Sequence, residues 1–268
     1  MTITANGNNI FCIKNNDFNG VLVIGVMHGD EPQGEFLITE YLKQNHNTKL
    51  AFIPTLNPDG KALNTRVNAN GVDINRNFPT ENWIKSERNE FFGGEYPASE
   101  IETQFLIDTV ENIQPKLILT LHAPFKVVNY DGNAKVVAQI ISEIIKYPVE
   151  ESIGYPTPGS FGTWAGVEKQ IPTITLELDE EIDIKAEMQI NCSVFGEMEI
   201  DVVSAITEGA GCEKINNSAI TVYFPNYEET LWDIAKRYNT TVESIVLENN
   251  LSGDTTKDVK MLFIPSAT

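Results

Sequence analysis

VLVIGVMHGDEPQGE, residues 21–35, indicates the fold class, because an apolar run of strand length leads into a polar turn and then into a helical pattern. Residues 21–26 carry no charged side chain, as expected of a strand that is buried on both faces. Similar apolar runs recur at residues 50–56, 117–121 and 173–178 and alternate with helical patterns. The sequence therefore predicts an α/β fold around a mostly parallel sheet covered on both faces.

Residues with metal chemistry follow or end three of these runs. His28 and Glu31 follow the first run, His122 directly follows the third, and Glu177 lies near the end of the fourth. Open α/β sheets bind ligands beyond the carboxyl ends of their strands, so these side chains are expected to converge. A hydrolytic zinc commonly takes two histidines and one glutamate and keeps a fourth position for water. The third histidine, His46, lies in a polar run and is expected at the surface.

His28, Glu31 and His122 therefore predict a site for one zinc ion, with Glu177 as the adjacent base. Taken alone, a histidine and a glutamate three residues apart are more often a helix cap or a surface pair. Glu177 has a competing interpretation as a buried structural carboxylate. An unpaired carboxylate in the apolar run TITLEL is costly, so either interpretation requires a cation nearby.

The segment between the ligands, residues 57–79, is rich in glycine and asparagine and carries Asn57, Arg66, Asn75, Arg76 and Phe78. Such loops carry function more often than packing. HGDEPQGE, NPDG, RVNANGVDINRNFP, LHAP and GTWAGVEKQIPTITLEL occur in this order within about residues 21–178. Together they resemble the zinc carboxypeptidases of the M14 type. Within that family the chain is most similar to the short bacterial enzymes that cleave murein peptides between γ-D-glutamate and diaminopimelate.

The resemblance implies a role for each remaining polar residue. Glu177 would take a proton from water and pass it to the leaving amine. Arg66 would polarise the substrate carbonyl and stabilise the oxyanion, while Arg76, assisted by Asn75, would bind the terminal carboxylate. Tyr155 falls where the family often places a mobile tyrosine over the substrate. The alternative for either arginine is a salt bridge within the loop.

Two helices are expected beside the sheet. Ser99 and Glu102 form a capping box, as N-cap and N3, at the start of the first. Its core-facing residues are predicted to be Ile101, Phe105, Val110 and Ile113. The core-facing residues of the second are predicted to be Val136, Val137, Ile140, Ile141, Ile144 and Ile145.

The chain changes character after Leu178. Apolar residues alternate with polar ones from Ile182 to Val194, which predicts half-buried antiparallel strands. From Ile220 the pattern of a strand, two short amphipathic helices and a final strand resembles a LysM module. The apolar faces of its helices are predicted to be Leu231, Trp232, Ile234, Ala235 and Tyr238, then Val242, Ile245 and Leu247.

LysM modules recognise N-acetylglucosamine polymers such as peptidoglycan, which is the partner that this resemblance implies. Glu228-Glu229 and Asp258 depart from the usual LysM residues at two turns. A small helical appendage without a ligand is the alternative. The expected division is a catalytic domain at 1–180, a β-rich connecting segment at 181–217 and a LysM-like domain at 218–268.

Composition excludes some classes of partner. The chain has 268 residues, 41% of them hydrophobic, and its 19 basic and 38 acidic side chains give a net charge of −19. This charge disfavours nucleic acid and anionic membranes. Three scattered cysteines suggest no disulfide framework. No basic, apolar leader is present, so a cytoplasmic location is expected, with association with a spore or cell wall as the alternative.

Two other functions fit parts of the pattern. The aspartoacylase and desuccinylase group shares HGxE, an Asn-Arg pair and a later histidine, and hydrolyses small N-acyl amino acids. A cell-wall or spore-coat binding protein with a decayed peptidase domain would keep the fold without turnover. The murein peptide amidase interpretation is favoured by RNFP, by the long motif before Leu178 and by the LysM-like tail.

Overall fold

The computed structural model describes most of the chain. It covers residues 1–45, 48–151, 156–179, 194–196, 198, 220–223, 230–237, 240–248, 251 and 262–265. His46, Tyr155, Cys192 and Cys212 lie outside these ranges, and Cys12 is a free thiol. The chain divides into two compact units, Met1–Ala210 and Gly211–Thr268. The three-part division at residues 180 and 217 stays a prediction.

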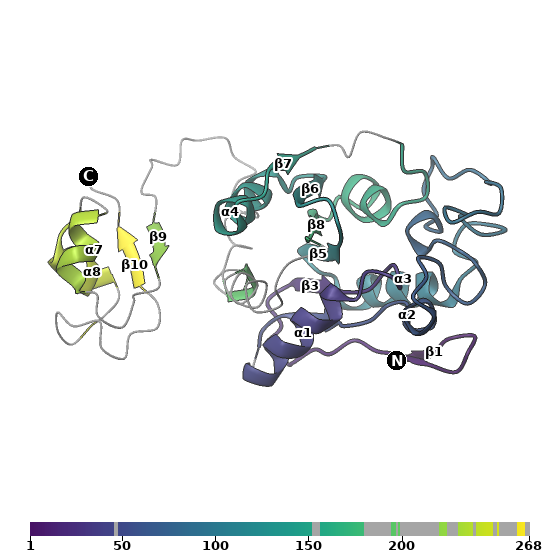
Figure 1. Ribbon diagram of the computed structural model, residues 1–268, viewed down its shortest axis with the longest axis horizontal. Coiled ribbons are helices and arrows are strands. Elements are labelled where there is room, and N and C mark those ends of the chain that lie inside the picture. The colour runs from purple at the N-terminus through teal and green to yellow at the C-terminus, as the bar shows by residue number, and fades with distance from the viewer. Residues whose placement is uncertain are drawn as a thin grey trace. The chain divides into compact units, whose positions relative to one another are not determined.

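A six-stranded sheet forms the centre of the first unit (Figure 1), in the order β4-β3-β5-β8-β6-β7. The strands are β3 (Val21–Ile24), β4 (Ala51–Ile53), β5 (Leu117–His122), β6 (Val127–Asp131), β7 (Val149–Glu150) and β8 (Thr173–Glu177). β4, β3, β5 and β8 pair in parallel, whereas β6 runs antiparallel to β8. The predicted α/β fold is confirmed, and the unpredicted β6 makes the sheet mixed.

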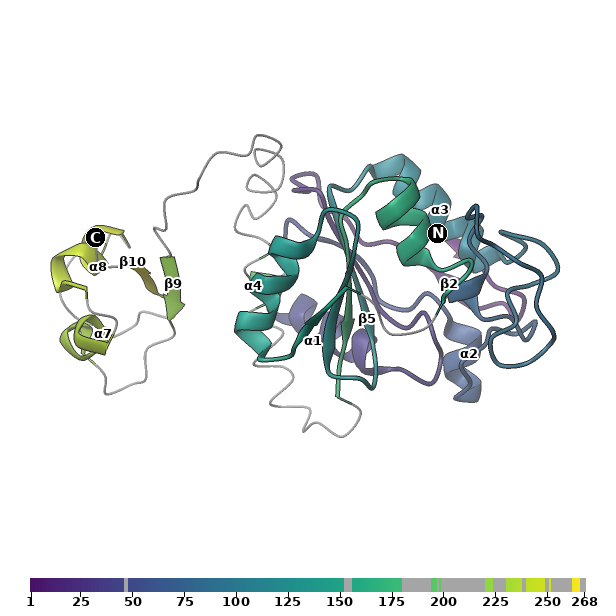
Figure 2. The ribbon, with the colours of Figure 1, turned by 90° about the horizontal axis from the view of Figure 1, so that it is seen from above.

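Helices cover both faces of this sheet (Figure 2). On one face α1 (Gln33–Gln44) and α4 (Lys135–Ile145) bury Leu37, Ile38, Val137, Ala138 and Ile141 against the strands. On the other face α3 (Ile101–Ile113) and the π-helix η2 (Thr163–Glu168) contribute Phe105, Leu106 and Trp164. Val23 and Ile24, which are adjacent in β3, therefore belong to two different hydrophobic cores, one on each face of the sheet.

Shorter elements lie outside the sheet. β1 (Thr2–Ile3) and β2 (Asn9–Ile10) form a small antiparallel pair. α2 (Pro58–Leu63) and the 3-10 turn η1 (Ile74–Arg76) lie in the loop that follows β4. None of the described helices combines the length and apolar character that a membrane span requires.

A helical segment after β8 contributes to the core. Val194 and Phe195 are helical and fully buried, and Met198 is buried with them. The Phe195 ring lies 5.1 Å from that of Tyr41 and 5.9 Å from that of Phe52. The strand prediction is therefore wrong at Val194, because the packing of Phe195 on α1 outweighs the local alternation. Residues 182–192 of the predicted strands lie outside the described residues.

The predicted capping box of α3 is wrong. The N-cap is Glu100, and its side chain makes no cap hydrogen bond. Ser99 Oγ donates to Glu100 Oε1 at 2.6 Å, and Glu102 accepts from Asn68 Nδ2 at 3.1 Å. The backbone N–H of Glu100 donates to Asn77 Oδ1 at 3.1 Å. Side chains of the preceding loop thus replace the local cap.

The predicted apolar faces are correct in most positions. Phe105, Val110, Val137 and Ile141 are buried as expected, and Leu106, which was not predicted, is buried with them. Ile101 and Val136 are exposed, because each lies at the first turn of its helix, beyond the edge of the packed face.

The second unit has the predicted βααβ order. β9 (Ile220–Tyr223) pairs antiparallel with β10 (Leu262–Pro265), and α7 (Leu231–Arg237) and α8 (Val242–Glu248) lie between them in sequence. Leu231, Ile234, Ala235 and Ile245 form its core. Tyr238 and the side chain of Leu247 lie outside the described residues.

Trp232 was predicted on the buried face of α7 and is instead 62% exposed. A helix advances about 100° per residue, so position 232 turns away from the face that carries Leu231 and Ala235. The Lys236 ammonium lies 5.0 Å from the centre of the Trp232 ring.

Phe195→Ala should destabilise the first unit by about 3–5 kcal/mol, because it leaves a cavity between α1 and β4 that the core cannot refill. Phe125→Ala is the matched control, since Phe125 is 61% exposed and its loss should change the free energy of unfolding little. Urea unfolding of both variants measures the difference. Equal stability of the two would show that the segment around Phe195 does not pack on the core.

Candidate active site

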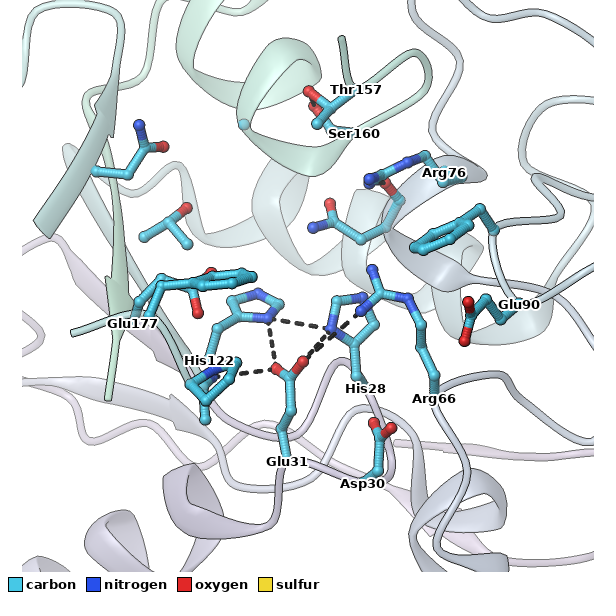
Figure 3. Close-up of a pocket in the computed structure, with 18 of the residues that line it drawn as sticks. His28, Asp30, Glu31, Arg66, Arg76, Glu90, His122, Thr157, Ser160 and Glu177 are labelled. Carbon is cyan, nitrogen blue, oxygen red and sulfur yellow. Dashed lines mark hydrogen bonds and ion pairs between the residues drawn. The ribbon is translucent and has the colours of Figure 1, made fainter. Parts of the chain in front are cut away.

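His28, Glu31 and His122 gather at the carboxyl ends of the central strands (Figure 3). Nδ1 of His28 lies 2.8 Å from Glu31 Oε1, and Nδ1 of His122 lies 2.8 Å from Glu31 Oε2. The two Nδ1 atoms are 3.2 Å apart. His28 follows β3, Glu31 precedes α1 and His122 ends β5, so parallel pairing of β3 with β5 brings the three together.

This donor set fits a zinc ion. Each residue offers one ligand atom, and these atoms all lie within 4.8 Å of one another. Both imidazoles are buried, and their Nδ1 atoms face the same carboxylate. Two imidazole nitrogens and one carboxylate are the ligands of many hydrolytic zinc sites, which leave a fourth position open. The cluster can therefore hold one divalent ion.

Asp73 orients the first histidine. Its Oδ1 lies 3.2 Å from Nε2 of His28, on the side of the ring opposite the cluster, and Oδ2 accepts from Arg66 Nε at 2.9 Å. A carboxylate on the second nitrogen of a metal-binding histidine fixes its tautomer and ring orientation. Sequence reasoning missed Asp73, although an acid two residues before the Asn75-Arg76 pair was an available signal.

Electrostatics in the cluster favour charged side chains. Burial by itself lowers the pKa of His28, but the carboxylates of Glu31 and Asp73 raise it to about 9. Burial raises the pKa of Glu31, yet the two imidazoles hold it far below its usual range. The pKa of Asp73 is lowered in the same way, by His28 and Arg66 against burial. Without a metal, a proton on His28 balances these carboxylates at neutral pH.

Glu177 lies beside the cluster on the neighbouring strand. Its Cα pairs with that of His122 in the register between β5 and β8. The residue is 7% exposed, and no hydrogen-bond partner among the described residues reaches its Oε2. Burial raises its pKa, His122 opposes this rise and Glu31 adds to it. A buried carboxylate with an open acceptor oxygen is suited to accept a proton.

One cavity of about 790 Å³ joins these groups to the polar residues of the loop after β4. Arg76 is buried, and its Nη1 donates to the carbonyl of Asn75 at 2.7 Å. The backbone N–H of Phe161 donates to Asn75 Oδ1 at 2.9 Å. The Arg66 guanidinium lies 5.2 Å from the centre of the Phe91 ring. The guanidinium groups are thus held by the protein before a substrate binds.

The structure separates the singled-out residues into two groups. Those that line the cavity are His28, Glu31, Arg66, Asn75, Arg76, His122 and Glu177. Asn57 instead caps α2, because its side chain accepts from the backbone N–H of Gly60 at 2.9 Å. Phe78 is fully buried and packs on Phe161 at 5.1 Å and Trp164 at 5.7 Å. The structure does not describe Tyr155.

The fold and the donor set define a class of zinc hydrolases, and comparison with known proteins narrows it. Residues 1–195 match the family model described as zinc carboxypeptidase, and residues 226–260 match the model described as LysM domain. The first match covers more than half of the chain. The chain belongs to the zinc carboxypeptidase family.

Alignments with individual relatives span a smaller part of this chain than the family model does. The chain is 33% identical over 162 residues to murein peptide amidase A of Escherichia coli K12, covering 53% of this chain and 64% of the relative's length. The Vibrio campbellii protein of the same name is 32% identical over 177 residues, 59% of this chain and 68% of that protein.

Solved structures agree with this family. The crystal structure of a murein-tripeptide amidase from Escherichia coli O157 has a TM-score of 0.66 at 26% identity, over 74% of this chain and 89% of that one. Carboxypeptidase A from Helicoverpa armigera has a TM-score of 0.60 at 16% identity, over 79% of this chain and 68% of that one. The second likeness concerns the fold alone.

Zinc affinity should rise by roughly tenfold per pH unit between pH 6 and 8, because the proton that His28 holds up to a pKa of about 9 must leave when the metal binds. Competition with a chelator of known affinity measures this slope. Asp73→Asn removes one carboxylate that raises the pKa of His28. The zinc affinity of this variant should therefore stop rising at a lower pH than that of the unaltered protein. An affinity independent of pH over this range would contradict the protonation of His28.

Proposed function

We propose that the chain is a zinc-dependent amidase that hydrolyses the bond between γ-D-glutamate and a C-terminal diaminopimelate in a murein peptide. The observation that carries the proposal is the gathering of His28, Glu31 and His122 beside Glu177 in one cavity. The names of the amidase relatives from Escherichia coli and Vibrio campbellii support the substrate.

Glu177 acts as the general base. Zinc, when bound, polarises the scissile carbonyl and lowers the pKa of water at the site. Glu177 accepts a proton from the attacking water through its open Oε2 and passes it to the nitrogen of the leaving amine. Burial raises the pKa of this carboxyl, which strengthens it as a proton acceptor. Asp73 keeps the His28 ring in place throughout.

The two arginines bind different groups of the substrate, the scissile carbonyl and the terminal carboxylate. Arg66, held by Asp73 and covered by Phe91, donates to the carbonyl oxygen as negative charge develops on it. Arg76 and Asn75 bind the terminal carboxylate of the substrate, because a guanidinium can donate two parallel hydrogen bonds to a carboxylate. Tyr155 is proposed to close over the substrate, as the family resemblance implies.

Product analysis on L-Ala-γ-D-Glu-diaminopimelate separates this proposal from its alternatives. Release of free diaminopimelate, detected by mass, supports the amidase. Turnover of N-acyl amino acids without release of diaminopimelate would support the deacylase group instead. Zinc binding without turnover of any of these substrates would support a binding protein.

Glu177→Gln should lower kcat by about 10²–10⁴-fold while zinc stays bound, because only the proton acceptor is removed. His122→Ala should lose zinc, since two ligands remain. Zinc content by elemental analysis and kcat on the tripeptide give the two readouts. Retained turnover in Glu177→Gln would refute the role of this residue as base.

The LysM-like unit is proposed to hold the enzyme at peptidoglycan through N-acetylglucosamine, and so to associate it with the cell wall. This proposal is supported by the match at residues 226–260 and by the βααβ order of the unit. Binding to peptidoglycan would keep the enzyme close to the polymer from which its peptide substrates derive. Neither unit by itself identifies the ligand of the other.

A chain that ends at residue 210 should lose co-sedimentation with purified peptidoglycan and keep its kcat/KM on the soluble tripeptide. The cut lies at the boundary between the two compact units, so the sheet and the site remain intact. Equal sedimentation of the full and shortened chains would place glycan binding elsewhere.

A further inference from the structure

Asn57 joins two parts of the loop that follows β4, and the proposed chemistry does not use it. Its side chain is fully buried. Oδ1 accepts from the backbone N–H of Gly60 at 2.9 Å, which caps α2, and Nδ2 donates to the backbone carbonyl of Arg66 at 3.3 Å. A helix cap needs only the first of these bonds. The second connects Asn57 to the arginine that is proposed to bind the substrate carbonyl.

The backbone at Arg66 is not held by regular secondary structure. Residues 65–68 lie in no helix or strand. The Arg66 carbonyl accepts from Nδ2 of Asn57 and from the backbone N–H of Gly29, and the second bond is long at 3.4 Å. Loss of the Asn57 donor would leave this carbonyl with the longer bond to Gly29 among the described residues. Asn57 therefore contributes directly to the position of the Arg66 backbone.

Acidic side chains orient the other end of Arg66. Its Nε donates to Asp73 Oδ2 at 2.9 Å, and its Nη1 lies 3.7 Å from Glu31 Oε1 (Figure 3). The tip of a long side chain follows its backbone, so a shift of the Arg66 carbonyl changes where the guanidinium can reach. A misplacement of about 1 Å in a catalytic contact can lower a rate about 100-fold. Both ends of Arg66 must therefore be fixed for it to act on the substrate.

Two glycines make room for this arrangement. A Cβ at Gly29 would lie 2.0 Å from the carbonyl carbon of Gly60, and a Cβ at Gly60 would lie 2.5 Å from Nδ2 of Asn57. Gly29 lies in the turn between the metal ligands His28 and Glu31, and Gly60 lies in the first turn of α2. The turn that carries the metal ligands therefore packs on the helix end that Asn57 caps.

We propose that Asn57 is a positioning residue, whose hydrogen bond to the Arg66 carbonyl holds the Arg66 guanidinium where negative charge develops on the scissile carbonyl oxygen. This inference rests on the proposed amidase function. Arg66 acts mainly in the transition state, so a displaced guanidinium lowers kcat. The terminal carboxylate is bound by Arg76 and Asn75, so KM changes little. Zinc stays bound, because Asn57 contacts none of the three metal ligands through its side chain.

Two variants of the full chain remove the Nδ2 donor and keep the helix cap. Asn57→Asp has the same shape with an acceptor in place of the donor, and Asn57→Ser keeps a capping oxygen without adding a charge. Each should lower kcat on L-Ala-γ-D-Glu-diaminopimelate about 10- to 100-fold, with KM changed less than about twofold and zinc content unchanged. Affinity for a phosphinate analogue of the scissile amide, measured by calorimetry, should fall by the same factor as kcat/KM.

Asn19→Asp is the matched control. Oδ1 of Asn19 accepts from the backbone N–H of Val21 at 3.1 Å, and Nδ2 donates to the carbonyl of Met198 at 2.9 Å. Asn19 thus bridges two backbone groups as Asn57 does, but it lies at the end of β3 opposite the metal ligands. Its substitution should lower the thermal midpoint and leave kcat, KM and analogue affinity unchanged.

Arg66→Ala separates positioning from a general structural role. In that background Asn57→Ser should cause no further loss of analogue affinity, because no guanidinium remains to be held. Independent, multiplying losses, an unchanged kcat in both Asn57 variants, or loss of zinc together with kcat would overturn the role of Asn57 while the amidase function stands. No turnover of the tripeptide by the unaltered protein would overturn the proposed function and this inference with it.

Discussion

The site depends on one desolvated carboxylate, Glu31, shared between two imidazoles whose Nδ1 atoms are 3.2 Å apart. A proton on an imidazole or a bound metal ion offsets the negative charge that burial makes costly on this carboxylate. The sheet enforces the contact, because parallel pairing of β3, β5 and β8 brings the ends of these strands together. Asp73 contacts both the ring of His28 and the guanidinium of Arg66, so one carboxylate positions a metal ligand and the arginine proposed to bind the substrate carbonyl.

The sequence was sufficient for the strands that build this site. Uninterrupted apolar runs identify strands buried on both faces, and polar residues at their carboxyl ends converge by the topology of an open sheet. For that reason His28, His122 and Glu177 could be expected in one place although they are far apart in the chain. The spacing of apolar residues predicted most of the buried positions on the helices. The same kind of pattern predicted the βααβ order of the second unit.

Features that depend on tertiary contacts could not be predicted. The N-terminus of α3 is satisfied by Asn77, which no local capping pattern reveals. Phe195 is helical because a pocket between α1 and β4 accepts its ring, which overrides the alternating pattern before it.

Anomalous diffraction at the zinc absorption edge, from crystals of the zinc-loaded protein, shows directly which side chains bind the metal. We expect one strong peak bonded to Nδ1 of His28, Nδ1 of His122 and a Glu31 oxygen, at about 2.0–2.2 Å from each. A peak away from these three side chains, or a peak that leaves either imidazole beyond bonding distance, would contradict it.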